Sequence, residues 1–141
     1  MRVFLDTNVI MDTLISGRPS SEASSRLVGL NQPPEQSEFR FSVSALSIAD
    51  LVYSSRKLLS KEFLRSEVEH IRNMYRVLPL SEWNIYDAMK SDCPDFEDAL
   101  QISIAEGDAD VIVTNNTRHF KGHTALEVVT PQEFLDRVSA D

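Results

Sequence analysis

The chain has 141 residues, a length that fits a single domain, residues 1–141, with a buried core. Hydrophobic residues make up 42% of it, which excludes a disordered composition. The net charge of −8 excludes a large basic face that follows nucleic acid by electrostatics alone, although a bound divalent cation could still meet a phosphate locally. The single cysteine, Cys93, excludes an internal disulfide and argues against a zinc site built on cysteines.

The predicted elements alternate between strands and helices. Apolar runs predict strands at 3–5, 39–43, 76–80, 109–113 and 126–129. Helical spacing of apolar residues predicts helices at 8–15, 20–30, 44–59, 60–74, 81–89, 95–105 and from Thr130 onward. Loops are expected at 31–35 and 115–125. This order favours a three-layer α/β/α fold with a central, mainly parallel sheet.

The first strand ends at Asp6, and the chemistry is predicted to gather there. In an open α/β sheet, ligands bind in the crevice outside the carboxyl ends of the strands. A simpler alternative is that Asp6 only caps the first helix, although Thr7 or Asn8 already offers a cap. A carboxylate at this edge needs partners from later parts of the chain.

Two later segments bring further acids. Asp50 lies within the apolar run 47–51, so its carboxyl is expected to point away from the core; a partly exposed helix position is an equal alternative. Asp95 and Asp98 are three residues apart and share one face of a helix. Taken alone, they are better explained as an N-cap and a first-turn acid, which the helix dipole favours.

Polar residues also follow the buried strand 109–113. Thr114 and Asn116 would ordinarily be turn formers. Asp12 is expected at the surface beside Arg18. The three histidines show no spacing typical of metal ligands.

Asp6 and Thr114 both follow buried strands, so we expect them at the same edge of a parallel sheet. If Asp98 also points there, three or four carboxylates converge without a lysine or arginine among them. Such like charges raise one another's pKa unless a cation holds them. Oxygen ligands alone select Mg²⁺ or Mn²⁺, and such an ion can activate water and clamp a phosphoryl oxygen. The pattern is typical of a metal-dependent phosphodiester hydrolase.

Five segments, in order along the chain, carry a family resemblance: 4–12, 43–50, 95–101, 111–116 and 130–135. Each segment is weakly specific, but the ordered set spans essentially the whole chain. With them the chain resembles the PIN domain ribonucleases, and more closely the VapC-type toxins of bacterial toxin–antitoxin pairs. The resemblance implies Mg²⁺- or Mn²⁺-dependent cleavage of RNA by acids at the strand edge.

The resemblance also implies roles for individual acids. Asp6 matches the first acid of the family, and Asp98 matches the acid that opens the later helix. Asp95 is the acid one turn before it. Asp50 occupies the place where many members carry a glutamate.

Besides Asp50, two positions depart from the family pattern. Asn116 stands where many members carry a fourth acid, and His119 replaces another acid common in this subgroup. Thr114 matches a residue that usually hydrogen-bonds near the first acid. The resemblance therefore implies one well-held metal and a weakened second metal position.

We predict a metal-dependent endoribonuclease, the toxin of a bacterial type II toxin–antitoxin pair. Asp6 and Asp98 are predicted to bind the metal, and Asp50 and Asp95 to bind it through water or to orient the attacking water. Thr114 and Asn116 complete the polar rim. The expected partners are an RNA substrate and a small antitoxin protein.

Two further expectations concern assembly and location. The helices that begin at Ser20 and Ser60 offer apolar surface for a homodimer. The sequence shows no leader segment and no apolar run of membrane length, so a cytoplasmic protein without membrane contact is expected.

Two alternatives remain open. A catalytically weakened PIN-like module that binds RNA or protein would explain the departures at Asp50, Asn116 and His119. A phosphoacceptor domain ranks lower, because it needs paired acids after the first strand and a lysine after the last, and no lysine follows Val129.

Overall fold

The structure, a computed structural model, describes residues 1–15, 17–31 and 38–140. Five strands form one parallel sheet in the order β3-β2-β1-β4-β5. They are β1 (Arg2–Leu5), β2 (Arg40–Ser44), β3 (Arg76–Leu78), β4 (Val111–Val113) and β5 (Glu127–Val129). The predicted central parallel sheet is therefore confirmed.

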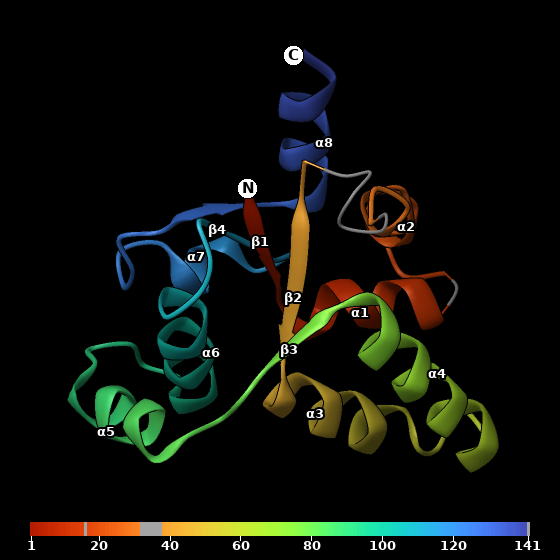
Figure 1. Cartoon of the computed structure of the whole chain (residues 1–141), viewed down its shortest axis with the longest axis horizontal. Helices are drawn as coiled ribbons and strands as arrows, with labels where there is room; N and C mark the ends of the chain where they lie inside the picture. The colour runs from red at the N-terminus through yellow and green to blue at the C-terminus, as the bar shows by residue number, and fades with distance from the viewer. Residues whose placement is uncertain (16, 32–37, 141) are drawn as a thin grey trace.

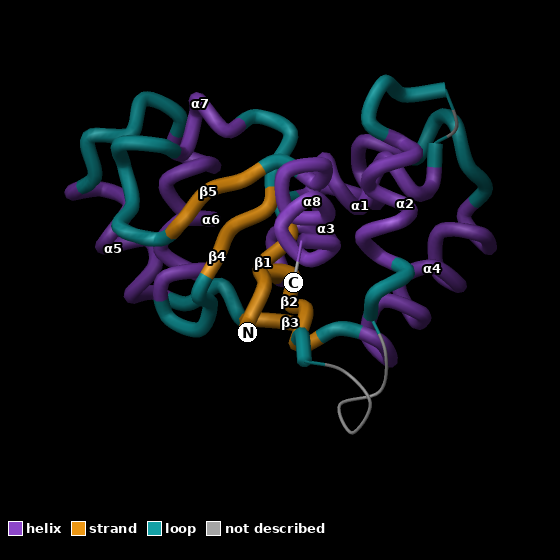
Figure 2. The backbone as a smooth tube through the Cα atoms, turned by 90° about the horizontal axis from the view of Figure 1, so that it is seen from above, coloured by secondary structure: helices purple, strands orange, loops and turns teal. Residues whose placement is uncertain are grey.

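Eight helices in the described part of the chain surround the sheet: α1 (Thr7–Leu14), α2 (Ser21–Val28), α3 (Ala45–Ser55), α4 (Lys61–Met74), α5 (Glu82–Lys90), α6 (Phe96–Glu106), α7 (Thr117–Phe120) and α8 (Pro131–Ala140). Figure 1 shows the elements along the chain. Viewed from above in Figure 2, the strands lie between α5, α6 and α7 on one side and α1, α2 and α4 on the other. This arrangement is the predicted three-layer α/β/α fold.

Two cores, one on each face of the sheet, explain the continuous apolar runs of the strands. Val3 and Leu5 of β1 belong to the core under α1, α2 and α8, whereas Phe4 between them belongs to the core under α6 and α7. All three side chains are fully buried. A strand that is covered on both faces needs apolar residues at successive positions, which is why these strands do not alternate with polar ones.

Two predicted boundaries are wrong. The helix expected at 44–59 ends at Ser55, and a turn follows in which the Leu58 and Leu59 amides both donate to the Ser55 carbonyl at 3.0 Å. Ser60 then turns extended and caps α4 through its hydroxyl. The loop expected at 115–125 contains α7. Most of the loop predicted at 31–35 lies outside the described residues.

The start of α8 follows the sequence pattern closely. The Glu133 amide donates to the Thr130 hydroxyl at 3.1 Å, and the Thr130 amide donates to the Glu133 carboxylate at 3.1 Å. This reciprocal pair is the predicted capping box. Within the described ranges, no helix has both the length and the apolar character that crossing a membrane requires.

The strand order creates a switch point between β1 and β4. From β1 the chain adds β2 and β3 on one side, and then returns to add β4 and β5 on the other. At such a point the connections leave in opposite directions, and a crevice opens outside the carboxyl ends of the two strands. Leu5 pairs with Val113 there, so Asp6 and Thr114 both follow directly at this crevice.

Candidate active site at the switch point

Asp6 and Thr114 meet at the switch point. The Thr114 hydroxyl donates to Asp6 Oδ2 at 2.8 Å, and the Asp6 amide donates to the Val113 carbonyl at 3.0 Å. Both residues are buried. Parallel pairing of β1 with β4 thus brings together two residues that are 108 positions apart in the sequence.

Asp6 also caps α1, so the expectation that Thr7 or Asn8 supplies this cap is wrong. The Thr7 amide donates to Asp6 Oδ1 at 2.8 Å, and the Asn8 side-chain amide donates to Oδ2 at 3.2 Å. Thr7 and Asn8 already have helical backbone, and an N-cap must be extended, which leaves Asp6 as the cap. The cap does not compete with a catalytic role, because a carboxylate can accept about four hydrogen bonds.

The surroundings of the Asp6 carboxyl disfavour its ionised form. Its pKa is raised from 3.8 to about 6, chiefly by burial and in smaller part by the charges of Asp98 and Asp50, while the hydrogen bonds from Thr114 and Thr7 oppose the change. The charged side chains that shift this pKa, Asp98 and Asp50, are both negative. A group in this state gains from a proton or from a cation.

Asp50 approaches Asp6 from α3 and meets Glu97 of α6, a residue that the sequence analysis missed. The Glu97 carboxyl lies within hydrogen-bond reach of Asp50; this contact, then burial and the Asp50 charge, raise the pKa of Glu97 to about 7. Asp50 Oδ2 is buried and has no hydrogen-bond donor among the described residues. Two facing carboxylates carry no donor between them, so a shared proton or a cation is needed to satisfy this oxygen.

Asp98 lies beside His119, with Oδ2 at 3.5 Å from the imidazole Nδ1. Burial and the Asp95 charge raise the pKa of Asp98, and His119 opposes this. Asp95 is exposed and caps α6 through a bond from the Asp98 amide at 2.9 Å, which is the simpler of its two predicted explanations. Its backbone is extended, and its charge acts on Glu97 and Asp98 rather than on Asp6.

The segment after β4 forms the rim of the site through its asparagines. The Asn116 amide donates to the Thr114 hydroxyl at 3.0 Å, while the residue itself is exposed. The Asn115 amide donates to the Asn8 side-chain oxygen at 3.2 Å. Asn8 therefore joins Asp6 to this segment, a role that its position as a possible helix cap did not reveal.

Asp12 was expected at the surface, and this expectation is wrong. It is 3% exposed and accepts hydrogen bonds from Arg18 at 2.6 Å, Ser24 at 2.8 Å and Asn115 at 2.7 Å. The pairing with Arg18 was foreseen, but the packing of α2 and of the segment after β4 over α1 was not. Asp12 thus anchors the rim of the site to the helices beneath it.

We expect Asp12→Asn to lower the free energy of unfolding by about 2 kcal/mol, because three hydrogen bonds lose their charged acceptor. Urea denaturation measures this loss. The matched control is Asp110→Asn, which removes an acid whose ion pair with Arg2 is about half exposed on both sides, and whose loss is expected to stay below about 1 kcal/mol. Equal losses in the two variants would contradict the anchoring role.

The donor set fits a hard divalent cation. Carboxylate oxygens are the ligands that Mg²⁺ and Mn²⁺ prefer, and Asp50 Oδ2 is a buried oxygen that has no donor within the described ranges. No group of three or more His, Cys, Asp or Glu side chains in the described ranges is gathered closely enough to hold a metal by itself. Mg²⁺ often takes one or two carboxylates and completes its shell with water and substrate phosphate, so a ready cage is not required.

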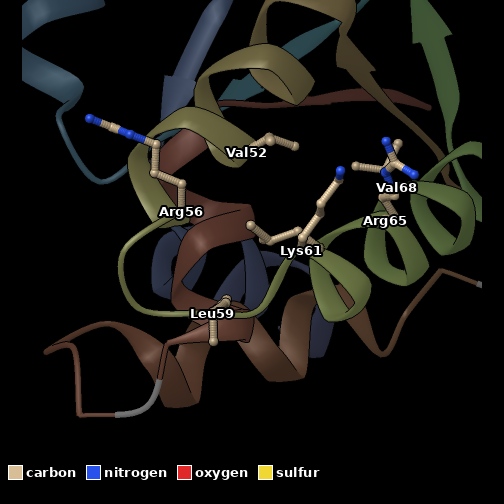
Figure 3. Close-up of a pocket in the computed structure, with 7 residues that line it drawn as sticks. Val52, Arg56, Leu59, Lys61, Arg65 and Val68 are labelled. Carbon is tan, nitrogen blue, oxygen red and sulfur yellow. The ribbon is translucent and has the colours of Figure 1, made fainter.

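A separate groove lies away from these acids. It measures about 470 Å³ between α3 and α4 and is lined by Val52, Arg56, Leu59, Lys61, Leu64, Arg65 and Val68. Figure 3 draws these side chains as sticks and labels six of them, including the three cations. The lining holds no carboxylate and is chiefly apolar, so it offers nothing to a divalent ion. The acid group at the switch point therefore remains the candidate site.

The sequence places the chain in a known family. A model of the PIN domain matches residues 2–118, which is most of the chain, and the chain therefore belongs to the PIN domain family. No curated protein matches it by sequence.

Solved structures of toxin–antitoxin complexes share the fold. The DNA-bound VapBC of Salmonella typhimurium is 19% identical, covers 93% of this chain and 98% of its own, and has a TM-score of 0.69. VapBC2 of Rickettsia felis, bound to a promoter DNA fragment, is 20% identical with coverages of 91% and 97% and a TM-score of 0.66. VapC20 of Mycobacterium tuberculosis, described as a toxin that cleaves the sarcin–ricin loop, is 14% identical with coverages of 78% and 86% and a TM-score of 0.61.

Proposed function

We propose that this PIN domain protein is a Mg²⁺- or Mn²⁺-dependent endoribonuclease and the toxin of a toxin–antitoxin pair. The observation that carries the proposal is the buried Asp6 at the switch point, whose pKa is raised to about 6 and on which further acids act. Such a group is costly to keep for stability alone, because buried charges normally have partners of opposite sign. Membership of the PIN family supports hydrolysis of a phosphodiester as the reaction.

Asp6 and Asp98 would hold the cation, with Asp50 and Asp95 acting through water. The bound ion would supply charge for the phosphoryl oxygens and lower the pKa of a coordinated water. The acidic net charge fits this arrangement, because a chain at −8 needs a local cation to receive a phosphate. Glu97 is added to these acids because its carboxyl contacts Asp50.

Other side chains at the site orient the carboxyls and the water. Thr114 and Thr7 pin both oxygens of Asp6, so its carboxyl cannot rotate. The Asp50 carboxylate, whose buried Oδ2 has no donor among the described residues, would orient the attacking water. Glu97 beside it retains a proton near neutral pH and so limits the charge of the pair.

RNA is the proposed substrate, and an antitoxin protein is the proposed partner. The structural neighbours from Salmonella typhimurium and Rickettsia felis are VapBC complexes, and VapC20 is described as cleaving the sarcin–ricin loop. These likenesses support the same kind of partner and the same kind of substrate here.

The test is RNA cleavage by the purified chain with Mg²⁺, with Mn²⁺ and with a chelator. We expect internal cleavage products with either metal and none with the chelator. Cleavage that persists in the chelator, or its absence with both metals, would contradict the proposal.

The alternative is a PIN-like module that binds RNA or protein without cleaving. It is favoured by the lack of a three-donor group in the described ranges and by the neutral Asn116 and the basic His119 at positions where the family often has acids. Calorimetric titration with Mn²⁺ separates the two functions. Binding in the millimolar range or tighter supports the enzyme, and no heat of binding supports the module.

A further inference from the structure

A buried polar cluster lies directly behind the acids. It consists of Thr7, Ser44, Ser47 and Gln101, which we call the glutamine cluster. The Ser44 hydroxyl donates to Gln101 Oε1 at 2.7 Å, and Gln101 Nε2 donates to the Ser47 hydroxyl at 2.9 Å and to the Thr7 hydroxyl at 3.4 Å. Three of the four residues are buried, and Gln101 is among the largest fully buried side chains of the described chain.

The hydroxyls complete the cluster among themselves. The Thr7 hydroxyl donates to the Ser47 hydroxyl at 2.8 Å, the Ser44 and Ser47 hydroxyls lie 3.1 Å apart, and the Ser47 amide donates to the Ser44 hydroxyl at 2.9 Å. When Ser44 gives its proton to Gln101, the Ser47 proton falls between the two serines. Both amide protons of Gln101 and all three hydroxyl protons then have acceptors, so the cluster has one self-consistent arrangement.

Three members of the cluster lie close in sequence to the acids. Thr7 follows Asp6 directly, and Ser47 precedes Asp50 by three residues on α3. Residues three or four apart in a helix lie on one face.

Gln101 has the same relation to the acids of α6. It follows Glu97 by four residues and Asp98 by three, so it shares their face of the helix. The cluster therefore joins the start of α1, the end of β2 with α3, and α6, close to the carboxyls that these parts of the chain carry. Like charges brought this close repel, and something must hold their backbones together.

We infer that Gln101 is a positioning residue, which sets the spacing of the carboxyls of Asp6, Asp50, Glu97 and Asp98 through Ser44, Ser47 and Thr7. This inference rests on the proposed function, because it assigns the spacing to metal binding. Gln101 itself touches neither the cation nor the substrate. Outer residues of this kind typically change metal affinity or activity by about 10–100-fold when replaced.

The main test replaces Gln101 by leucine, which fills a similar volume but forms no hydrogen bond. We expect Gln101→Leu to weaken Mn²⁺ binding by about tenfold or more in calorimetry, and to lower kcat on RNA while KM changes by less than about twofold. The matched control is Ser103→Ala on the same helix, which loses the bonds to Asn84 and Asp87 of α5 instead. Mn²⁺ binding by this control should stay within about twofold of the native chain.

A second variant covers the case in which Gln101→Leu does not fold. Thr7→Val keeps the shape and removes one hydroxyl from the cluster, and Thr7→Ser restores that hydroxyl. We expect Thr7→Val to weaken Mn²⁺ binding and Thr7→Ser to recover most of it. A native affinity in folded Gln101→Leu or in Thr7→Val would overturn the inference and leave the cluster with a structural role alone.

The carboxyl spacing can also be read without catalysis. The ¹³C chemical shifts of the Asp6 and Asp50 carboxyl carbons report their surroundings in the metal-free chain. We expect these chemical shifts to change in Gln101→Leu and Thr7→Val and to remain at their native values in Ser103→Ala and Thr7→Ser. If the native chain binds no Mn²⁺, the proposed function fails. The chemical shifts still test the positioning role of Gln101 in that case, and unchanged shifts in Gln101→Leu and Thr7→Val would overturn it.

Discussion

Asp6→Asn is expected to abolish RNA cleavage while the chain stays folded. Asparagine keeps the size of the side chain and one acceptor oxygen, so the bond from the Thr7 amide that caps α1 can persist. The lost charge removes the proposed first ligand of the metal. Because a metal contributes several kcal/mol to such a reaction and about 1.4 kcal/mol corresponds to tenfold, we expect a fall in kcat of about 100-fold or more.

The matched control is Asp136→Asn, the same chemical change at an exposed position of α8. Its rate should equal that of the native chain. Circular dichroism and the melting temperature establish that both variants are folded. Equal cleavage by Asp6→Asn and the control would remove Asp6 from the chemistry and assign any activity to another site or to a contaminant.

The metal-free chain is expected to lose stability as the pH rises from about 4 to about 7. Burial raises the pKa of Asp6 from 3.8 to about 6, and the contact with Asp50 raises that of Glu97 from 4.5 to about 7. A raised pKa means that the folded chain binds a proton that the unfolded chain has already released, so folding weakens with rising pH in this window. Above its folded pKa, the ionised Asp6 alone lowers the free energy of unfolding by on the order of 3 kcal/mol relative to acidic pH.

Melting curves at about pH 5 and about pH 8, each with and without Mn²⁺, measure this effect. Mn²⁺ should restore stability at the higher pH, because a ligand that binds only the folded state stabilises it. Asp6→Asn should flatten the pH profile and respond less to Mn²⁺. Asp92 and Asp110, whose pKa values are lowered from 3.8, act below this window, and Glu127, whose pKa is lowered from 4.5, overlaps only its lower end. A native melting temperature that does not change between these pH values would contradict the raised pKa values of Asp6 and Glu97.

Parts of the site followed from strand order alone. Asp6 and Thr114 end neighbouring parallel strands, and parallel strands present their carboxyl ends at one edge, so their meeting was predictable from two apolar runs. The capping box of α8 was equally local, because its two bonds join residues three positions apart. Such features depend on neighbours in the sequence or on one pairing of strands.

Other parts needed the packing of helices. The sequence did not single out Glu97, and only the approach of α3 to α6 places it against Asp50. Gln101 lies within a predicted helix, but its hydrogen-bond partners come from the start of α1 and from the β2–α3 junction. Asp12 was taken for a surface acid until α2 and the segment after β4 enclosed it.

By itself, then, the sequence determined the α/β class, the parallel sheet, the PIN resemblance and the edge at which Asp6 stands. Only the tertiary structure decided which acids lie against one another, which serve as caps and which polar residues lie behind them. The physical reason is that periodicity defines the faces of a helix but not the element on which each face packs. For Asp6, that packing turns a helix cap into the buried centre of an acid cluster.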